Sequence, residues 1–248
     1  MAGHSKWANI RFRKGAQDAK RGKLFTKLIR EITVATKAGG PDPDNNPRLR
    51  SAIDKGLSNN MKRDTIETAV KKGSGTADTD NFDEIRYEGY GPAGTAVIVD
   101  CLTDNKNRTV AEVRHAFNKS GGNLGTSGSV DYMFKKLGII NLSNKHDEYA
   151  LMDAALEAGA DDVITHDDGS FEVLTQADDF MPIRDALLEA GFRAEHAEVT
   201  LRADILSPVS LKDAEKILRL LDVLEDLDDV QNVYSSADFP DEALELNE

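Results

Sequence analysis

Between residues 130 and 203 the pattern of apolar residues alternates between strand and helix periods, and this order restricts the possible fold more than any other feature. Six segments alternate there: strand-like 132–142, helical 149–158, strand-like 161–165, strand-like 170–175, helical 181–190 and strand-like 197–201. The order β-α-β-β-α-β is that of the split βαβ, or ferredoxin-like, motif. The sequence therefore predicts a ferredoxin-like domain over residues 130–203.

A second mixed pattern lies on both sides of this domain. The expected elements before it are two strands, the Gly/Pro turn that joins them and a helix, at 84–88, 95–102, 89–94 and 109–119. After it come only one helix, 211–224, and one strand, 230–234. Because one helix and one strand cannot bury a core alone, we expect them to pack on residues 84–129. Residues 84–129 and 204–238 would then form one discontinuous α+β domain, into which the ferredoxin-like domain is inserted.

The first 73 residues have a helical pattern. Apolar residues recur at helical spacing over 23–37, and glycines and a proline then end that helix. A second helix is expected to begin at Pro47, with Asn46 as its N-cap. In a third, short helix, Asp64 and Glu67 have the spacing of a capping box.

We expect the third helix to end before Gly73, where a linker of small and polar residues, 73–83, begins. The predicted fold class is therefore α+β. A small N-terminal three-helix domain, 1–73, is followed by two α/β domains, one of them ferredoxin-like (βαββαβ) and inserted into the other.

The charge of the chain changes sign at the same linker. Residues 1–72 contain 17 Lys/Arg and 7 Asp/Glu, whereas residues 73–248 contain 14 and 37. The two parts carry net charges of +10 and −23, which the total of −13 conceals. Residues 1–72, called the basic head below, could therefore bind a polyphosphate, while the anionic remainder of the chain repels it.

The cations of the first thirty residues are the main candidate site. They number nine, are opposed only by Asp18, and alternate with small residues and with Trp7 and Phe12. Lysine and arginine neutralise phosphates, and an aromatic ring can stack on an unpaired base. A second basic stretch enters the helix expected at 109–119. The predicted nucleic-acid-binding residues are Lys6, Trp7, Arg11, Arg13, Lys14, Lys20, Arg21, Lys23, Lys27, Lys106, Arg108 and Arg114.

Each stretch also has a simpler interpretation. The head can be a solvated basic segment in which Trp7 only fills the helical bundle. The stretch at Lys106 and Arg108 can be an ordinary capped loop between a strand and a helix. The tail from residue 222 to 248, with ten Asp/Glu and no Lys or Arg, is expected to solvate the surface. Shielding of the head by this tail is the weaker alternative.

No set of residues has the spacing of a catalytic or metal site. Residues 89–94 match G-x-G-x-x-G, but a strand rather than a helix follows, so we interpret them as a hairpin turn. Cys101 lies in an expected strand, which favours a buried, inert thiol. The acidic pairs 161–162, 167–168 and 228–229 are interpreted as solvated turns. We expect a non-enzymatic protein without cofactor, metal or small-molecule substrate.

No membrane segment is expected either. No apolar run approaches the roughly 18–20 residues that span a bilayer, and the N-terminus lacks the apolar core of a secretory signal. The single cysteine, Cys101, excludes an intramolecular disulfide and fits a reducing compartment. We expect a cytoplasmic protein without a membrane partner.

Five segments of the chain resemble signature segments of the YebC/PmpR family, which includes the mitochondrial translational activator of cytochrome c oxidase. They are MAGHSKWANIRFRKGAQDAKRGKLFTKLIREI, NNPRLRSAIDKG, YEGYGPAGTA, DNKNRTVAEVRHAFNKSGGNLG and LEAGADDV. The resemblance covers residues 1–234. One departure is Phe12, where a histidine is common in the family, so a titrating side chain is not carried over to this position.

The resemblance implies a helical N-terminal domain and two α/β domains. It also implies a cytoplasmic, non-enzymatic, DNA-binding transcriptional regulator. Members are linked in addition to the ribosome, as factors that relieve stalling during translation. Our first hypothesis is therefore a regulator that binds duplex DNA through the basic head. The alternative is a ribosome-associated translation factor that binds ribosomal RNA with the same cations. An enzyme is the third and weakest reading.

Overall fold

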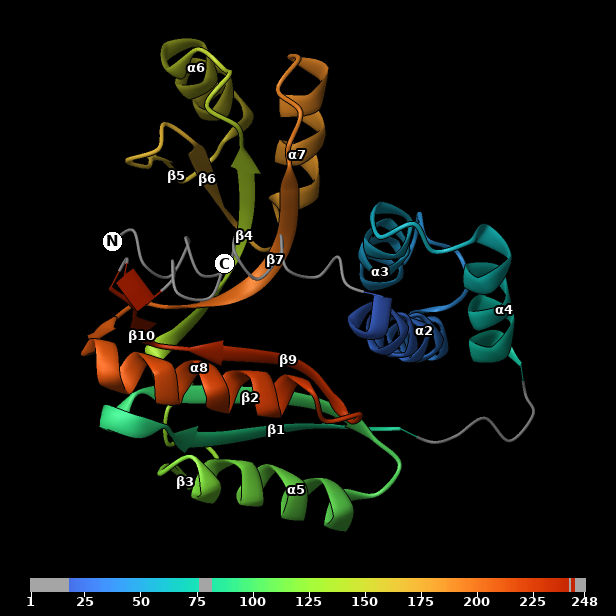
Figure 1. Ribbon diagram of the computed structural model, residues 1–248. Helices are drawn as coiled ribbons and strands as arrows, with labels where there is room; N and C mark the ends of the chain where they lie inside the picture. Colours follow the sequence, from blue (N-terminus) through green and yellow to red (C-terminus); the bar gives the residue numbers. More distant parts are fainter. Residues whose placement is uncertain (1–17, 76–81, 241, 244–248) are drawn as a thin grey trace. The chain divides into compact units, whose positions relative to one another are not determined.

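The computed structural model describes residues 18–75, 82–240, 242 and 243, with side chains from residue 22 onwards. It divides into two compact units (Figure 1). One unit is Tyr132–Leu206, and the other is formed by the described residues before and after it. None of the described helices is long and apolar enough to cross a membrane.

The unit Tyr132–Leu206 has the predicted ferredoxin-like fold. Its elements are β4 (Phe134–Leu142), α6 (Glu148–Ala158), β5 (Asp162–Thr165), β6 (Phe171–Gln176), α7 (Phe180–Glu189) and β7 (His196–Ala203). The strands form an antiparallel sheet in the order β5-β6-β4-β7. Leu151 of α6 and Ile183 and Leu187 of α7 pack against this sheet in one core. The predicted motif is therefore confirmed.

The boundaries within this unit differ slightly from the prediction. The first strand starts at Phe134 rather than at residue 132, because Asp131–Met133 form a short 3-10 turn (η2). Helix α6 begins one residue earlier than predicted, because the Asp147 side chain accepts a hydrogen bond from the Ala150 amide at 2.9 Å and caps it.

The second unit contains a mixed sheet-and-helix region. Its elements are β1 (Asp83–Tyr90), η1 (Pro92–Gly94), β2 (Ala96–Thr103), α5 (Lys106–Lys119), β3 (Asn123–Leu124), β8 (Ser207–Pro208), α8 (Leu211–Glu225), β9 (Val230–Ser235) and β10 (Ala237–Asp238). The main sheet has the order β3-β1-β2-β9. Strand β9 pairs with β2 although the whole ferredoxin-like unit separates them in the sequence. The predicted insertion of one α/β region into the other is therefore confirmed.

One face of this sheet holds the core. Val97 and Val99 of β2 pack with Phe117 of α5 and with Leu220 and Leu221 of α8, all of them almost fully buried. Both helices thus cover the same face of the sheet. The expectation that the last helix and strand pack on residues 84–129 is confirmed. The short parallel pair β8–β10 was not predicted.

In the described part of the chain before this region there are three helices, as predicted: α2 (Asp18–Gly39), α3 (Pro47–Ser58) and α4 (Arg63–Ser74). Asn46 caps α3 by accepting from the Leu49 amide at 3.1 Å, and its own amide donates to the carbonyls of Ala35 at 2.8 Å and Gly40 at 2.9 Å. One buried side chain therefore joins the end of α2 to the start of α3. Ile32 and Leu49 are fully buried in the core between the helices.

Two details of the third helix were predicted wrongly. The capping box is absent, because Lys62 is the N-cap of α4 and makes no side-chain cap hydrogen bond. Gly73 does not end the helix but is buried inside its last turn. A Cβ there would lie 2.5 Å from the main-chain oxygen of Thr33 and 2.7 Å from Cβ of Thr36, so the absence of a side chain lets α4 approach α2. Of the predicted linker, residues 76–81 lie outside the described residues. The division of the chain into three domains stays a prediction.

Candidate nucleic-acid interface

The structure places only part of the predicted binding set. Lys6, Trp7, Arg11, Arg13 and Lys14 lie outside the described residues. Lys20 and Arg21 belong to α2, but their side chains are not described. Lys23 and Lys27 lie further along α2, and Lys106, Arg108 and Arg114 lie on α5.

Lys23 and Lys27 contact the C-terminal end of α8. The Nζ of Lys27 donates to the main-chain oxygen of Glu225 at 2.7 Å. The Nζ of Lys23 donates to the main-chain oxygen of Asp226 at 3.0 Å and pairs with its carboxylate at 3.3 Å. Carbonyl groups at a helix C-terminus lack intrahelical donors and carry the negative end of the dipole. The two ammonium groups therefore stabilise the end of α8.

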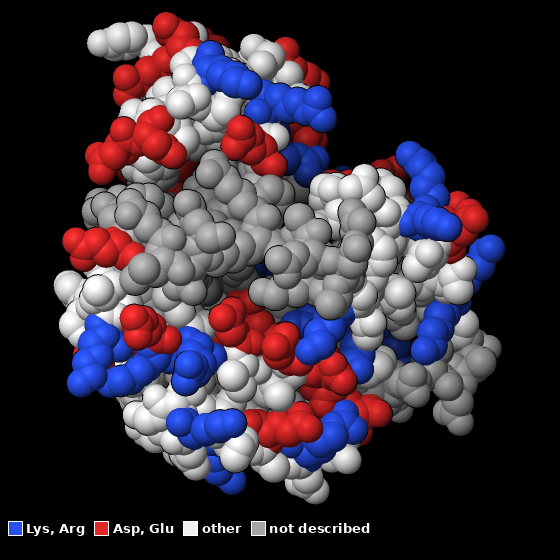
Figure 2. Space-filling model, viewed as in Figure 1, with Lys and Arg blue, Asp and Glu red and all other residues white. Residues whose placement is uncertain are grey.

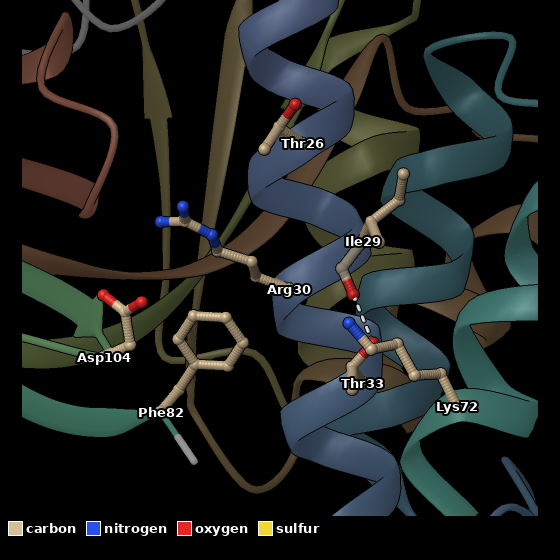
Figure 3. Close-up of a pocket in the computed structure, with 7 residues that line it drawn as sticks. All are labelled: Thr26, Ile29, Arg30, Thr33, Lys72, Phe82 and Asp104. Carbon is tan, nitrogen blue, oxygen red and sulfur yellow. Dashed lines mark hydrogen bonds between the residues drawn. The ribbon is translucent and has the colours of Figure 1, made fainter. Parts of the chain in front are cut away.

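Arg30, one helical turn beyond Lys27, extends this contact. Its Nη1 donates to the main-chain oxygen of Asp228 at 2.7 Å and to Oδ1 of Asp229 at 3.1 Å. Figure 3 shows the Arg30 side chain leaving α2 toward Phe82 and Asp104. The guanidinium carbon lies 5.3 Å from the centre of the Phe82 ring, a distance that permits a cation–π contact. The surrounding pocket of about 310 Å³ is lined by Thr26, Ile29, Arg30, Thr33, Lys72, Phe82 and Asp104.

Asp229 is the centre of these contacts. Its side chain is only 2% exposed. Besides Arg30, its carboxylate accepts from Nη2 of Arg108 at 2.7 Å, from Oγ1 of Thr109 at 2.9 Å and from Oγ1 of Thr103 at 3.0 Å. Burial alone would raise the pKa of Asp229, but the hydrogen bonds from Arg108, Thr109 and Thr103 outweigh it and lower that pKa. The interpretation of the pair 228–229 as a solvated turn is therefore wrong for Asp229.

The predicted basic stretch at the start of α5 is largely paired within the protein. Arg108 also bonds the Asp104 carboxylate at 2.7 Å, and Lys106 pairs with Asp83 at 3.2 Å. Asn105 caps α5 by accepting from the Arg108 amide at 3.1 Å. This is the geometry of the capped-loop alternative. Arg114 lies further along α5 and is exposed.

The groups around Asp229 line an open cleft of about 740 Å³. Its lining combines three cations with five carboxylates and one leucine: Lys23, Arg30, Arg108, Asp104, Glu112, Asp226, Asp228, Asp229 and Leu227. Figure 2 shows blue and red atoms interleaved where α8 ends and α5 begins. Acidic side chains outnumber basic ones among these described residues, which disfavours the binding of a phosphate in the cleft. Its cations join α2 to the sheet-and-helix region.

The structure also bears on the motifs interpreted as non-catalytic. Strands β1 and β2 are antiparallel neighbours, so the predicted hairpin is confirmed, but its turn is shorter than predicted, because residues 89 and 90 belong to β1 and pair with β2. Cys101 is buried, and burial raises the pKa of its thiol to about 12, so the thiolate is not formed near neutral pH. Among the described residues, no group of three or more His, Cys, Asp or Glu could hold a metal ion.

Sequence reasoning also missed the buried acid Glu88. Its carboxylate accepts from the backbone amides of Gly128 at 2.7 Å and of Val130 and Asp131 at 2.8 Å. These bonds shape the loop that leads toward the inserted unit. The sequence contained one signal for this burial. Glu88 lies in a strand-like segment next to the apolar segment that forms β2, and the two strands pair.

Comparison with known proteins extends over nearly the whole chain. The family model described as "TACO1/YebC protein N-terminal domain" matches residues 5–76, and that described as "TACO1/YebC second and third domain" matches residues 82–237. A probable transcriptional regulatory protein of Methylococcus capsulatus is 66% identical over 244 residues, which are 98% of this chain and 98% of the relative. One from Hahella chejuensis is 62% identical over 245 residues, covering 99% and 98% of the two chains.

The fold has a solved counterpart as well. The crystal structure of a conserved hypothetical protein from Aquifex aeolicus matches with a TM-score of 0.80 and 44% sequence identity, over 90% of this chain and 92% of that chain. The resemblance noted in the sequence is thus confirmed by both family models and by relatives of nearly equal length. The chain belongs to the TACO1/YebC family.

Proposed function

We propose that this protein is a non-enzymatic, cytoplasmic transcriptional regulator that binds DNA through the basic segment preceding Lys23. The names of its relatives, probable transcriptional regulatory proteins, support the regulatory role. One observation carries the choice of segment. Residues 1–21 contain six Lys/Arg and one Asp/Glu. The next cations, Lys23 and Lys27, already hydrogen-bond the end of α8.

The contacts of α2 distinguish the cations that are paired within the protein from the cations that precede Lys23. A cation that is hydrogen-bonded to a carbonyl or a carboxylate has fewer donors left for a phosphate, and a carboxylate partner also cancels part of its charge. Lys23, Lys27 and Arg30 are in this position, and so are Lys106 and Arg108 on α5. The six cations before Lys23 stand in a stretch with a single acidic residue. They are therefore the groups best suited to neutralise phosphates and release counterions.

The test is the triple variant R11A/R13A/K14A. Its affinity for duplex DNA should fall at least about tenfold at low salt, and nearly equally for all sequences, because phosphate contacts carry no sequence information. The slope of log affinity against log salt should become shallower by about 2.7, since each lost phosphate contact removes roughly 0.9. Fluorescence anisotropy of a labelled duplex, titrated at several salt concentrations, measures both quantities.

A matched control removes the same charge elsewhere. Lys212, Lys216 and Arg219 lie on α8, and K212A/K216A/R219A should bind DNA as the parent does. The proposal is wrong if the head variant binds like the parent, or if both triple variants lose affinity equally. Crosslinking in cells, followed by sequencing of the attached nucleic acid, identifies the ligand. DNA fragments support the proposal, whereas ribosomal RNA alone would replace DNA regulation by the translational alternative.

A further inference from the structure

Helix α6 of the ferredoxin-like unit carries an apolar stripe on its exposed side. Tyr149, Met152 and Leu156 are 79%, 39% and 67% exposed. Their spacing of three and four residues puts them on one face of the helix. The core of the unit takes a different face of the same helix, through Leu151 and Ala155, which are fully buried. The stripe residues therefore do not belong to the hydrophobic core of this unit.

Carboxylates border the stripe on both sides. Helical periodicity places Glu148 on one side of it and Asp153 and Glu157 on the other, and all three residues are exposed. Helix α6 contains no Lys or Arg. Over residues 132–206 there are 16 Asp/Glu and six Lys/Arg, a net charge of −10. The stripe thus lies in a negative field.

This combination limits what can cover the stripe. A nucleic acid brings phosphates toward a surface that already carries excess negative charge, which is unfavourable. A second copy docking by the same face would oppose two surfaces of like charge. A helix with apolar residues along one side and Lys or Arg beside them would bury the stripe and meet the carboxylates. Of these three occupants, the last satisfies both features.

We propose that the outer face of α6 is a docking surface for a basic amphipathic helix of a partner protein. Apolar contact with Tyr149, Met152 and Leu156 would supply most of the affinity. The flanking carboxylates would select a cationic partner and speed its association. The surface belongs to a different unit from the DNA-binding segment proposed above, so either proposal can fail without the other.

The probe is an 18-residue peptide of Leu and Lys, arranged so that a helix has one apolar and one cationic face. It is labelled with fluorescein and titrated with the full-length protein by anisotropy. Saturable binding is expected, and Y149S/L156S should raise the Kd at least tenfold. D153N/E157Q should raise the Kd several-fold at low salt and make it less sensitive to salt. Circular dichroism checks that each variant is folded.

Matched controls remove similar groups elsewhere in the same unit. Ile205→Ser removes an apolar side chain that is 65% exposed but outside α6. D185N/E189Q removes two exposed carboxylates four residues apart on α7. Both controls should bind the peptide as the parent does.

Several results would overturn the proposal. One is a parent protein that does not bind the peptide, or that binds a Leu/Glu peptide equally well. Another is an unchanged Kd for Y149S/L156S, or a loss of binding in the controls that matches the loss in the α6 variants. Sedimentation equilibrium adds a third: a dimer of the parent that Leu156→Ser dissociates would show that a second copy covers the stripe.

Discussion

A single buried carboxylate, that of Asp229, joins side chains from three elements. Its partners are Arg30 on α2, Arg108 and Thr109 on α5, and Thr103 at the end of β2. Removing the carboxylate leaves buried donors without an acceptor, a loss of the kind that costs several kcal/mol. We expect Asp229→Ala to lower the free energy of unfolding by about 3 kcal/mol, as measured by urea denaturation.

Its neighbour in the sequence is the control for this change. The side chain of Asp228 is exposed, and Arg30 bonds only its main-chain oxygen, which a substitution retains. Asp228→Ala should therefore change stability by less than about 0.5 kcal/mol. Equal effects of the two substitutions would show that the hydrogen bonds of Asp229 contribute little.

The contribution of the Asp229 carboxylate to the free energy of unfolding should depend on pH. The pKa of Asp229 lies below its ordinary value of 3.8, because the effect of burial, which raises it, is outweighed by the hydrogen bonds from Arg108, Thr109 and Thr103. A lowered pKa contributes stability above the unfolded-state value, and that stability is lost as the pH falls through the folded-state value. Parental stability should therefore decrease from about pH 4 downwards. Asp229→Ala should have a flatter profile in this range, and an unchanged acid slope would contradict the assignment.

At the scale of elements, two helical glycines of the N-terminal helices have opposite roles. A Cβ added at Gly22 in α2 would meet no atom of the described residues within 4 Å, whereas one at Gly73 in α4 would press on the Thr33 carbonyl. Gly22→Ala should raise the free energy of unfolding by about 0.5–1 kcal/mol through helix propensity. Gly73→Ala should lower it by about 1–3 kcal/mol, because α4 must move away from α2. Urea denaturation of both variants gives the comparison, and effects of the same sign would contradict it.

Elements that depend on local chemistry could be predicted from the sequence. The Asn46-Pro47 start of α3 is one, because the cap and the first helical residue are neighbours. The alternation that gives α6, α7 and their four strands is another. The wrong capping box at Asp64 shows the limit of spacing rules, since α4 starts at Arg63 and no side chain caps it. The role of Gly73 was missed for a related reason, because only the position of α2 explains it.

At the scale of the whole molecule, the candidate site was harder to predict than the fold. The charge count located a basic head, but it could not tell which cations face the protein itself. Arg30 and Asp229 are 199 residues apart, and Arg108 and Asp229 are 121 apart. Their meeting depends on the pairing of β9 with β2, which brings the end of α8 beside the start of α5. No local pattern in the sequence encodes that contact.

The two compact units have separate cores, and this predicts how the whole molecule unfolds. Leu187 is buried in the core of the ferredoxin-like unit, and Leu221 in the core of the sheet-and-helix region of the other unit. No described strand pairs across the two main sheets. Each Leu→Ala substitution should cost about 3 kcal/mol within its own core. We expect two urea transitions, with Leu187→Ala lowering one midpoint and Leu221→Ala the other. Hydrogen exchange assigns each transition to its peptides. A single transition that both variants shift would show that the units unfold together.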